Sequence, residues 1–172
     1  MKSQFSLSLL SMAALAYSAP AAAQLQDVTE LVGLQVDGTA SGATWIDLDG
    51  DARPDLIVAL SDGPRVWQNQ PGIAGAQFED VTDEWATSWL AVEGATAALA
   101  ADVTQDGVPD VVFVMSRQVV VFVGTRSGDV TTFFGDAGAP DFVWAAEIGD
   151  EVGGAAIMDA TDDGWLDLVV NT

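Results

Sequence analysis

The sequence predicts an all-β fold: a β-propeller-like array of about three four-stranded blades, of which the last is incomplete. Two observations support this prediction. One acidic segment recurs three times at a nearly constant spacing, beginning at Asp47, Asp102 and Asp159. An apolar run rich in β-branched residues follows each copy directly, as expected for strands that are buried on both faces.

Each acidic segment has the pattern D-x-[D/T]-x-D-x-x-x-D. Calcium takes about six to eight oxygen ligands, and alternate residues of a tight loop can direct their oxygens at one centre. The pattern therefore predicts up to three Ca²⁺ sites, with a backbone carbonyl as the ligand at the seventh position. The predicted ligands are Asp47, Asp49, Asp51, Arg53 and Asp55 in loop 1, Asp102, Thr104, Asp106, Val108 and Asp110 in loop 2, and Asp159, Thr161, Asp163, Trp165 and Asp167 in loop 3.

Two other interpretations of these loops are weaker. Asp and Gly are ordinary turn residues, but a plain turn requires neither the alternating acids nor the acid at the ninth position. Clustered carboxylates also repel one another unless a cation neutralises them. An EF-hand loop needs an acid at its twelfth position, where this sequence has Val58, Phe113 and Val170. Glycine at the sixth position (Gly107 and Gly164) is expected to supply a positive φ.

The strands and turns follow from the apolar runs and the residues between them. Strands are expected to enter the loops at Ala43–Ile46, Ala97–Ala101 and Ala155–Met158. Two hairpins are expected to leave them, Leu56–Leu60 with Arg65–Gln68 and Val111–Met115 with Val119–Val123. We expect a Gly/Ala loop over Pro71–Gln77, a short helical turn over Trp85–Trp89 and a less regular stretch over Gly124–Pro140.

The first 23 residues have the features of a signal peptide. Lys2 is followed by an apolar, Ser/Ala-rich run, and small residues precede a cleavage site after about Ala23. The run is short and Ser-rich for a membrane-spanning anchor. We therefore expect a repeat domain over residues 24–172, a secreted, periplasmic or extracellular location, and no membrane span after cleavage.

Composition excludes several classes of function. The net charge of −21 is unfavourable for nucleic-acid binding. The chain has no Cys and no His, which removes disulfides, thiol chemistry, His-based triads and ordinary zinc sites. Bound metal could then brace the fold in place of disulfides.

These loops, with their apolar exits and the Asp-Val-Thr segments at Asp27–Thr29 and Asp80–Thr82, resemble the FG-GAP/VCBS repeat family of the integrin α-subunit propeller. The resemblance covers roughly residues 27–172. It implies a β-propeller with one calcium in each blade's loop, used in adhesion or in binding an extracellular protein or glycan. The third repeat stops early, and closed propellers need about four to eight blades. We therefore expect a fragment, with further blades or domains in a longer chain.

The sequence departs from the family pattern in two ways. Thr104 and Thr161 offer neutral hydroxyls where the family usually has Asp or Asn, so ligand charge favours loop 1 as the tightest site. Loop 1 has Ala52 at the sixth position and is expected to use Gly50 for its reversal instead.

Two functions remain open at this stage. The leading hypothesis is a non-enzymatic module with structural calcium. The alternative is a part, catalytic or not, of an exported carbohydrate-active enzyme. Paired carboxylates can hydrolyse glycosides, but no spacing singles out a pair among Glu79, Glu93, Glu147 and Glu151. The tryptophans could bind sugars, although packing between blades is the more common role for such residues.

Overall fold

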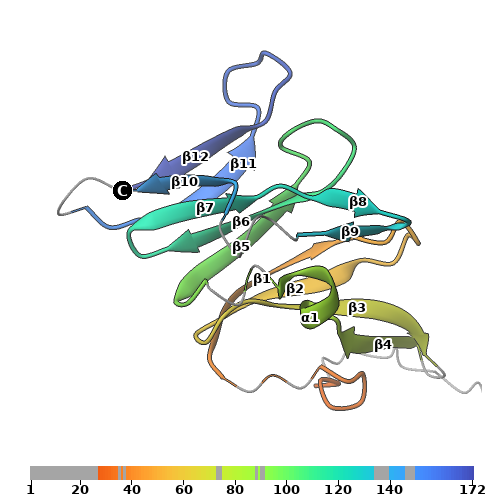
Figure 1. Cartoon of the computed structure of the whole chain (residues 1–172). Helices are drawn as coiled ribbons and strands as arrows, with labels where there is room; N and C mark the ends of the chain where they lie inside the picture. Colours follow the sequence, from red (N-terminus) through yellow and green to blue (C-terminus); the bar gives the residue numbers. More distant parts are fainter. Residues whose placement is uncertain are drawn as a thin grey trace, which may run out of the picture.

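The computed structural model describes residues 27–34, 36, 38–72, 75–87, 89, 92–133, 140–145 and 150–172, and these form an all-β fold (Figure 1). The predicted signal peptide over residues 1–23 lies outside the described residues. Within the described part of the chain, no helix is both long enough and apolar enough to cross a membrane.

Sheet 1 contains four antiparallel strands in sequential order: β1 (Ala40–Ile46), β2 (Asp55–Leu60), β3 (Arg65–Gly72) and β4 (Gly75–Asp80). The first three strands confirm the prediction. The predicted loop over Pro71–Gln77 is wrong, because β3 continues to Gly72 and β4 begins at Gly75. This end of the hairpin is polar and lies at the edge of the sheet, where proline is tolerated, so it lacks the apolar pattern of a buried strand.

Sheet 2 repeats this arrangement with β5 (Ala95–Ala101), β6 (Asp110–Met115), β7 (Gln118–Phe122) and β10 (Phe142–Ala145). A third, two-stranded sheet pairs β11 (Gly154–Met158) with β12 (Asp167–Asn171). The described residues thus confirm the predicted array, in which the last repeat has fewer strands than the first two. The stretch predicted to be irregular contains an extra hairpin, β8 (Thr125–Ser127) with β9 (Val130–Thr132).

A short helix, α1 (Thr82–Trp85), follows β4 and begins three residues before the predicted helical turn. The Asp-Val-Thr segment explains this start. The Asp80 carboxylate accepts hydrogen bonds from both the backbone N–H and the hydroxyl of Thr82, and the Thr82 hydroxyl accepts one from the backbone N–H of Val66 in β3. The segment therefore turns the chain and attaches α1 to sheet 1.

Each of the three sheets that carry an acidic loop begins with an end strand that enters the loop (β1, β5 and β11), and this strand is called the innermost strand. The innermost strands β1 and β5 lie side by side, and β5 also contacts β11 (Figure 1). Their Gly/Ala-rich sequences permit this close approach. A Cβ added at Gly42 would lie 2.8 Å from the Cα of Ala97. These strands consequently bring the ends that carry the acidic loops into one neighbourhood.

Apolar side chains fill the space between the sheets, as predicted for strands buried on both faces. One core cluster joins the facing sides of sheets 1 and 2 and includes Trp85 and Trp89, both buried. Trp67 is buried on the other face of sheet 1. These three tryptophans confirm the packing role. Trp45 and Trp165, beside or within the loops, are 54% and 56% exposed.

Candidate metal centres

The three acidic loops occupy equivalent places in the three sheets. Each joins the innermost strand to the next strand, and in each the ninth-position aspartate is the first residue of that second strand. The residue before the loop pairs with this aspartate across the strands. The pairs are Ile46 with Asp55, Ala101 with Asp110, and Met158 with Asp167. The repeated sequence pattern is therefore a repeated structure.

The backbone of each loop turns through two left-handed residues, at the fourth and sixth positions. The prediction of a positive φ at the sixth position is confirmed for Gly107 and Gly164, with φ of 84° and 85°. In loop 1 the expected turn at Gly50 is confirmed by its φ of 77°, but it does not replace the turn at the sixth position, because Ala52 also has a positive φ of 66°. Alanine in the left-handed region of φ/ψ space is strained by roughly 1 kcal/mol. Loop 1 tolerates this strain because the carboxylates of Asp47 and Asp51 hold its backbone by hydrogen bonds.

The first-position and fifth-position aspartates fold their own loops by accepting backbone hydrogen bonds. In loop 2 the Asp102 carboxylate accepts from the N–H of Asp106 at 3.1 Å and of Gly107 at 2.8 Å, and Asp106 accepts from the N–H of Val108 at 2.8 Å. The same contacts recur in the other loops, from Asp47 and Asp51 in loop 1 and from Asp159 and Asp163 in loop 3. These carboxylates are thus fixed in place before any ion is considered.

The ninth-position aspartates connect each loop to the body of its sheet. Asp110 is fully buried, and its carboxylate accepts from the N–H groups of Val103 and Thr104 in the loop and of Gly124 after β7, at 2.9, 3.0 and 2.9 Å. Asp55 is equally buried and accepts from the N–H of Leu48 at 2.9 Å and of Asn69 at 2.8 Å. In loop 3, Asp167 likewise accepts from the N–H of Ala160 and Thr161. This aspartate is therefore a structural brace as well as a predicted ligand.

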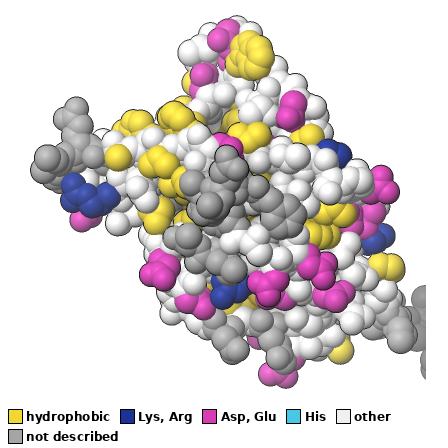
Figure 2. All heavy atoms as spheres, viewed as in Figure 1, with side chains coloured by type: hydrophobic (Ala, Val, Ile, Leu, Met, Phe, Trp, Pro, Cys, Tyr) yellow, Lys and Arg dark blue, Asp and Glu magenta, His cyan; other side chains and the backbone are white. Residues whose placement is uncertain are grey.

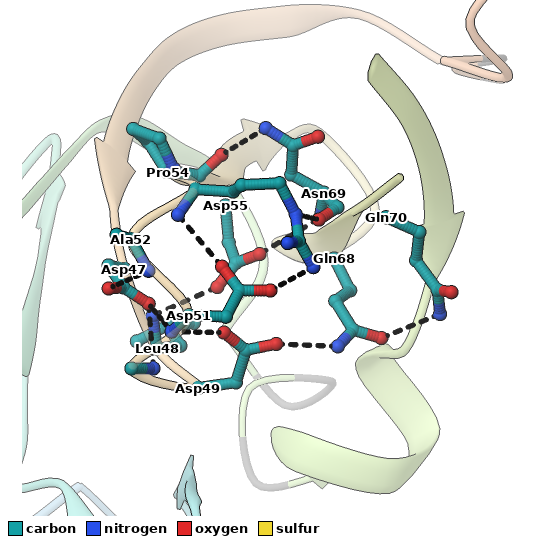
Figure 3. A network of polar contacts seen from close by, with 12 residues as sticks. Asp47, Leu48, Asp49, Asp51, Ala52, Pro54, Asp55, Gln68, Asn69 and Gln70 are labelled. Carbon is teal, nitrogen blue, oxygen red and sulfur yellow. Dashed lines mark hydrogen bonds and ion pairs between the residues drawn. The ribbon is translucent and has the colours of Figure 1, made fainter. Parts of the chain in front are cut away.

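Loop 1 brings three carboxylates together (Figure 3). Oxygens of Asp47, Asp49 and Asp55 all lie within 4.8 Å of one another, a grouping that could hold a metal ion. A set made only of carboxylate oxygens suits a hard cation such as calcium. Asp51, the remaining acid among the predicted ligands of loop 1, forms an ion pair with the side chain of Arg53.

The predicted ligands of loops 2 and 3 lie in loops of the same shape, with Thr104 and Thr161 at the third position. With a hydroxyl in place of that carboxylate, the predicted ligand set of each of these loops has one carboxylate fewer than that of loop 1, although loop 3 also contains Asp162 at its fourth position. At the seventh position, Val108 and Trp165 have apolar or indole side chains without a metal-ligating oxygen, so a ligand there would have to be the predicted backbone carbonyl. Gln105 of loop 2 donates a hydrogen bond to the carbonyl of Gly164 in loop 3 at 2.5 Å, so these two loops are neighbours.

The β8–β9 hairpin bridges loops 1 and 2. In β9 the N–H of Thr131 donates to the carbonyl of Leu48 in loop 1 at 2.7 Å, and the Arg126 guanidinium donates to the same carbonyl at 3.4 Å. Gly124, which precedes β8, packs so closely on loop 2 that an added Cβ would lie 2.1 Å from the carbonyl oxygen of Pro109. The hairpin therefore couples the positions of the two loops.

Sequence reasoning missed several residues that shape loop 1. Gln68 of β3 donates to the Asp49 carboxylate at 2.7 Å, and Arg53 acts through its side chain as well as its backbone. The N–H groups of Leu48 and Asn69 hold Asp55. Gln68 could have been suspected from the sequence only weakly, as a polar residue in a strand beside an acidic loop. The backbone donors could not, because almost every residue has an N–H whatever its side chain.

Burial raises the pKa of the Asp55 carboxyl from 3.8 to about 6. The hydrogen bonds from Asn69 and Leu48 act in the opposite direction, and the neighbouring charges of Asp49 and Asp51 add to the increase. In the absence of metal, the folded protein therefore binds this proton more tightly than the unfolded chain does.

This raised pKa predicts a pH dependence of stability in chelator. The stabilising contribution is fully present below pH about 4 and is lost as the pH rises through about 6. Urea unfolding should show that, between these limits, the wild type loses about 2–3 kcal/mol more than Asp55→Asn, which cannot titrate. Parallel pH profiles for the two proteins would contradict this prediction.

Comparison with known families agrees with the geometry of the loops. Residues 47–113 match the family model of the FG-GAP-like repeat. This range begins after β1 and spans loop 1, β2 to β4, α1, β5, loop 2 and the start of β6. No curated protein was found with significant similarity to the chain.

Proposed function

Because residues 47–113 are an FG-GAP-like repeat, we propose that this chain is an exported calcium-binding module that recognises an extracellular protein or glycan. FG-GAP-like repeats are typically extracellular, adhesion-type modules. Beyond the match over residues 47–113, we propose that the chain binds calcium through its acidic loops, is exported and recognises a partner.

The convergence of Asp47, Asp49 and Asp55 within 4.8 Å is the observation that carries the calcium proposal. Three carboxylates this close repel one another, and burial of Asp55 increases the penalty for keeping it charged. A divalent cation removes both penalties. Loops 2 and 3 share the left-handed positions and the backbone hydrogen bonds of loop 1, which extends the proposal to them and gives up to three ions.

Calcium is proposed to act as a structural ion. The residues that hold it would be the aspartates at the first, third, fifth and ninth positions, with the threonine hydroxyls of loops 2 and 3 and a backbone carbonyl at the seventh position. Bound there, calcium would supply cross-bracing between the two strands that each loop joins. We propose no catalytic role, because the loop carboxylates are engaged by backbone amides, which suits anchoring rather than proton transfer.

The surface is consistent with an exported binding module. Acidic side chains are spread over the face shown in Figure 2, where Lys and Arg side chains are few. With a net charge of −21, such a surface disfavours nucleic acid and anionic lipid. A protein or glycan partner, reached in part through calcium-braced loops, fits this chemistry better.

Thermal unfolding tests the calcium proposal directly. With about 5 mM calcium in place of chelator, the melting temperature should rise, each occupied site contributing about 1–2 kcal/mol for dissociation constants of about 10⁻⁴–10⁻³ M. Magnesium at the same concentration should stabilise less, because it requires a stricter octahedral geometry.

Asp47→Ala provides the control for this experiment, since it removes a ligand of loop 1 alone. It should reduce the calcium-dependent rise without abolishing it. A melting temperature that does not respond to calcium, together with no heat of binding in calorimetry, would rule out the calcium proposal.

A further inference from the structure

We infer that Arg53 is an internal competitor of the metal at loop 1, where its guanidinium lowers the calcium affinity of that loop and holds it in shape without metal. This inference rests on the proposed function, because it concerns how the same loop binds calcium. It assigns a role to a residue that the sequence pattern treats only as a source of a backbone carbonyl.

The Arg53 side chain is fixed at two points. Its terminal nitrogen forms an ion pair with Oδ2 of Asp51, and its Nε donates to the backbone carbonyl of Asn69 in β3 at 2.8 Å. The other oxygen of Asp51 accepts from the backbone N–H of Arg53 at 2.8 Å. Both oxygens of this predicted ligand are therefore engaged by one residue.

The ion pair changes the set of ligands that loop 1 offers. The convergent group contains Asp47, Asp49 and Asp55 (Figure 3). Asp51 is instead held by an ion pair with Arg53. Calcium can use Asp51 only if the ion pair opens or shares the carboxylate. A cation beside the loop also repels an incoming divalent ion.

The exposure of the pair sets the size of the effect. The side chains of Arg53 and Asp51 are 40% and 24% exposed, so the ion pair is screened by solvent and contributes modestly. Calcium can therefore displace the Arg53 side chain from Asp51. The ion pair would lower the calcium affinity of loop 1 without blocking the site.

Loops 2 and 3 offer an internal comparison, since Val108 and Trp165 carry no charge at the seventh position. Ligand charge favours loop 1, which has an additional carboxylate at Asp49. Arg53 opposes this advantage. The two effects together would bring loop 1 closer in calcium affinity to the other loops than its third-position carboxylate alone suggests.

The experiment is calcium titration of the full chain by calorimetry, combined with thermal unfolding in chelator. Arg53→Ala should bind calcium about 3–10-fold more tightly at one site, because one competing charge near the ion is removed. In chelator the same variant should melt at a lower temperature than the wild type. Arg53→Gln repeats the test with a side chain of similar length that has no charge.

Two controls assign the effect to loop 1. Arg65→Ala removes a cation that pairs with Asp62 outside the acidic loops, and should leave the calcium affinity unchanged. In an Asp47→Ala background, Arg53→Ala should no longer raise the affinity of any site.

The outcomes separate the two proposals. Calcium binding by the wild type with equal or weaker binding by both Arg53 variants would overturn the role of Arg53 alone. An absence of calcium binding in the wild type and in every variant would overturn the proposed function, and this inference with it.

Discussion

Replacing Trp89 by alanine should lower the free energy of unfolding by about 3–5 kcal/mol, the range found for large-to-small changes of fully buried aromatic residues. Trp89 is fully buried between sheets 1 and 2. Its ring lies 5.1 Å from that of Phe113, edge-on, and 4.7 Å from that of Phe133. The substitution would therefore leave a large cavity in the cluster that joins the two sheets.

Urea denaturation of the full chain in chelator measures this effect. Trp45→Ala is the matched control, because the same change at an exposed ring should alter stability by less than about 1 kcal/mol. Trp89→Phe should lose less than Trp89→Ala, since it keeps an aromatic ring and removes a buried indole N–H that has no hydrogen-bond partner in the described structure. Equal stabilities for Trp89→Ala and the wild type would show that this cluster does not hold the sheets together.

Replacing Asp110 by alanine should also be strongly destabilising, by about 3–5 kcal/mol. Its buried carboxylate accepts hydrogen bonds from three backbone N–H groups, those of Val103, Thr104 and Gly124. Alanine would leave these donors without their partner. The loss would affect both loop 2 and the start of the β8–β9 hairpin.

This prediction separates bracing from metal binding when it is measured in chelator. Asp106→Ala is the control, because Asp106 is a predicted ligand but is exposed and accepts from the single N–H of Val108. It should cost no more than about 1 kcal/mol without metal. If the two variants lose equal stability in chelator, Asp110 is not a brace.

The fold was predictable because it depends on patterns that side chains carry. The apolar runs after each loop identify β2 and β6, and the repeated acids identify how the chain turns into them. The edge strands β4 and β10 were not predicted, because one is polar and the other is only Phe142–Ala145. The β8–β9 hairpin consists of two three-residue strands, too short for alternation to be recognised.

The candidate site was predictable to the same extent and for the same reason. The spacing of the aspartates identifies the loops and the close approach of Asp47, Asp49 and Asp55. It does not show that Asp55 and Asp110 hold backbone amides, because Leu48, Asn69 and Gly124 contribute N–H groups that every residue except proline has. The contact of Arg53 with Asp51 was also missed, since the position alone suggests only a carbonyl ligand.

The ninth-position brace and the β8–β9 hairpin have opposite consequences for how such a chain can be rearranged by duplication or recombination. The hydrogen bonds accepted by the first-, fifth- and ninth-position aspartates come from each loop's own repeat, so a repeat carries these bonds with it wherever it is placed. The hairpin instead forms a separate two-stranded sheet that follows β7 of sheet 2 in the chain and docks on Leu48 of loop 1. The hairpin therefore ties sheet 2 to sheet 1. A repeat inserted between the two sheets would break this contact, although the hydrogen bonds within each loop would remain.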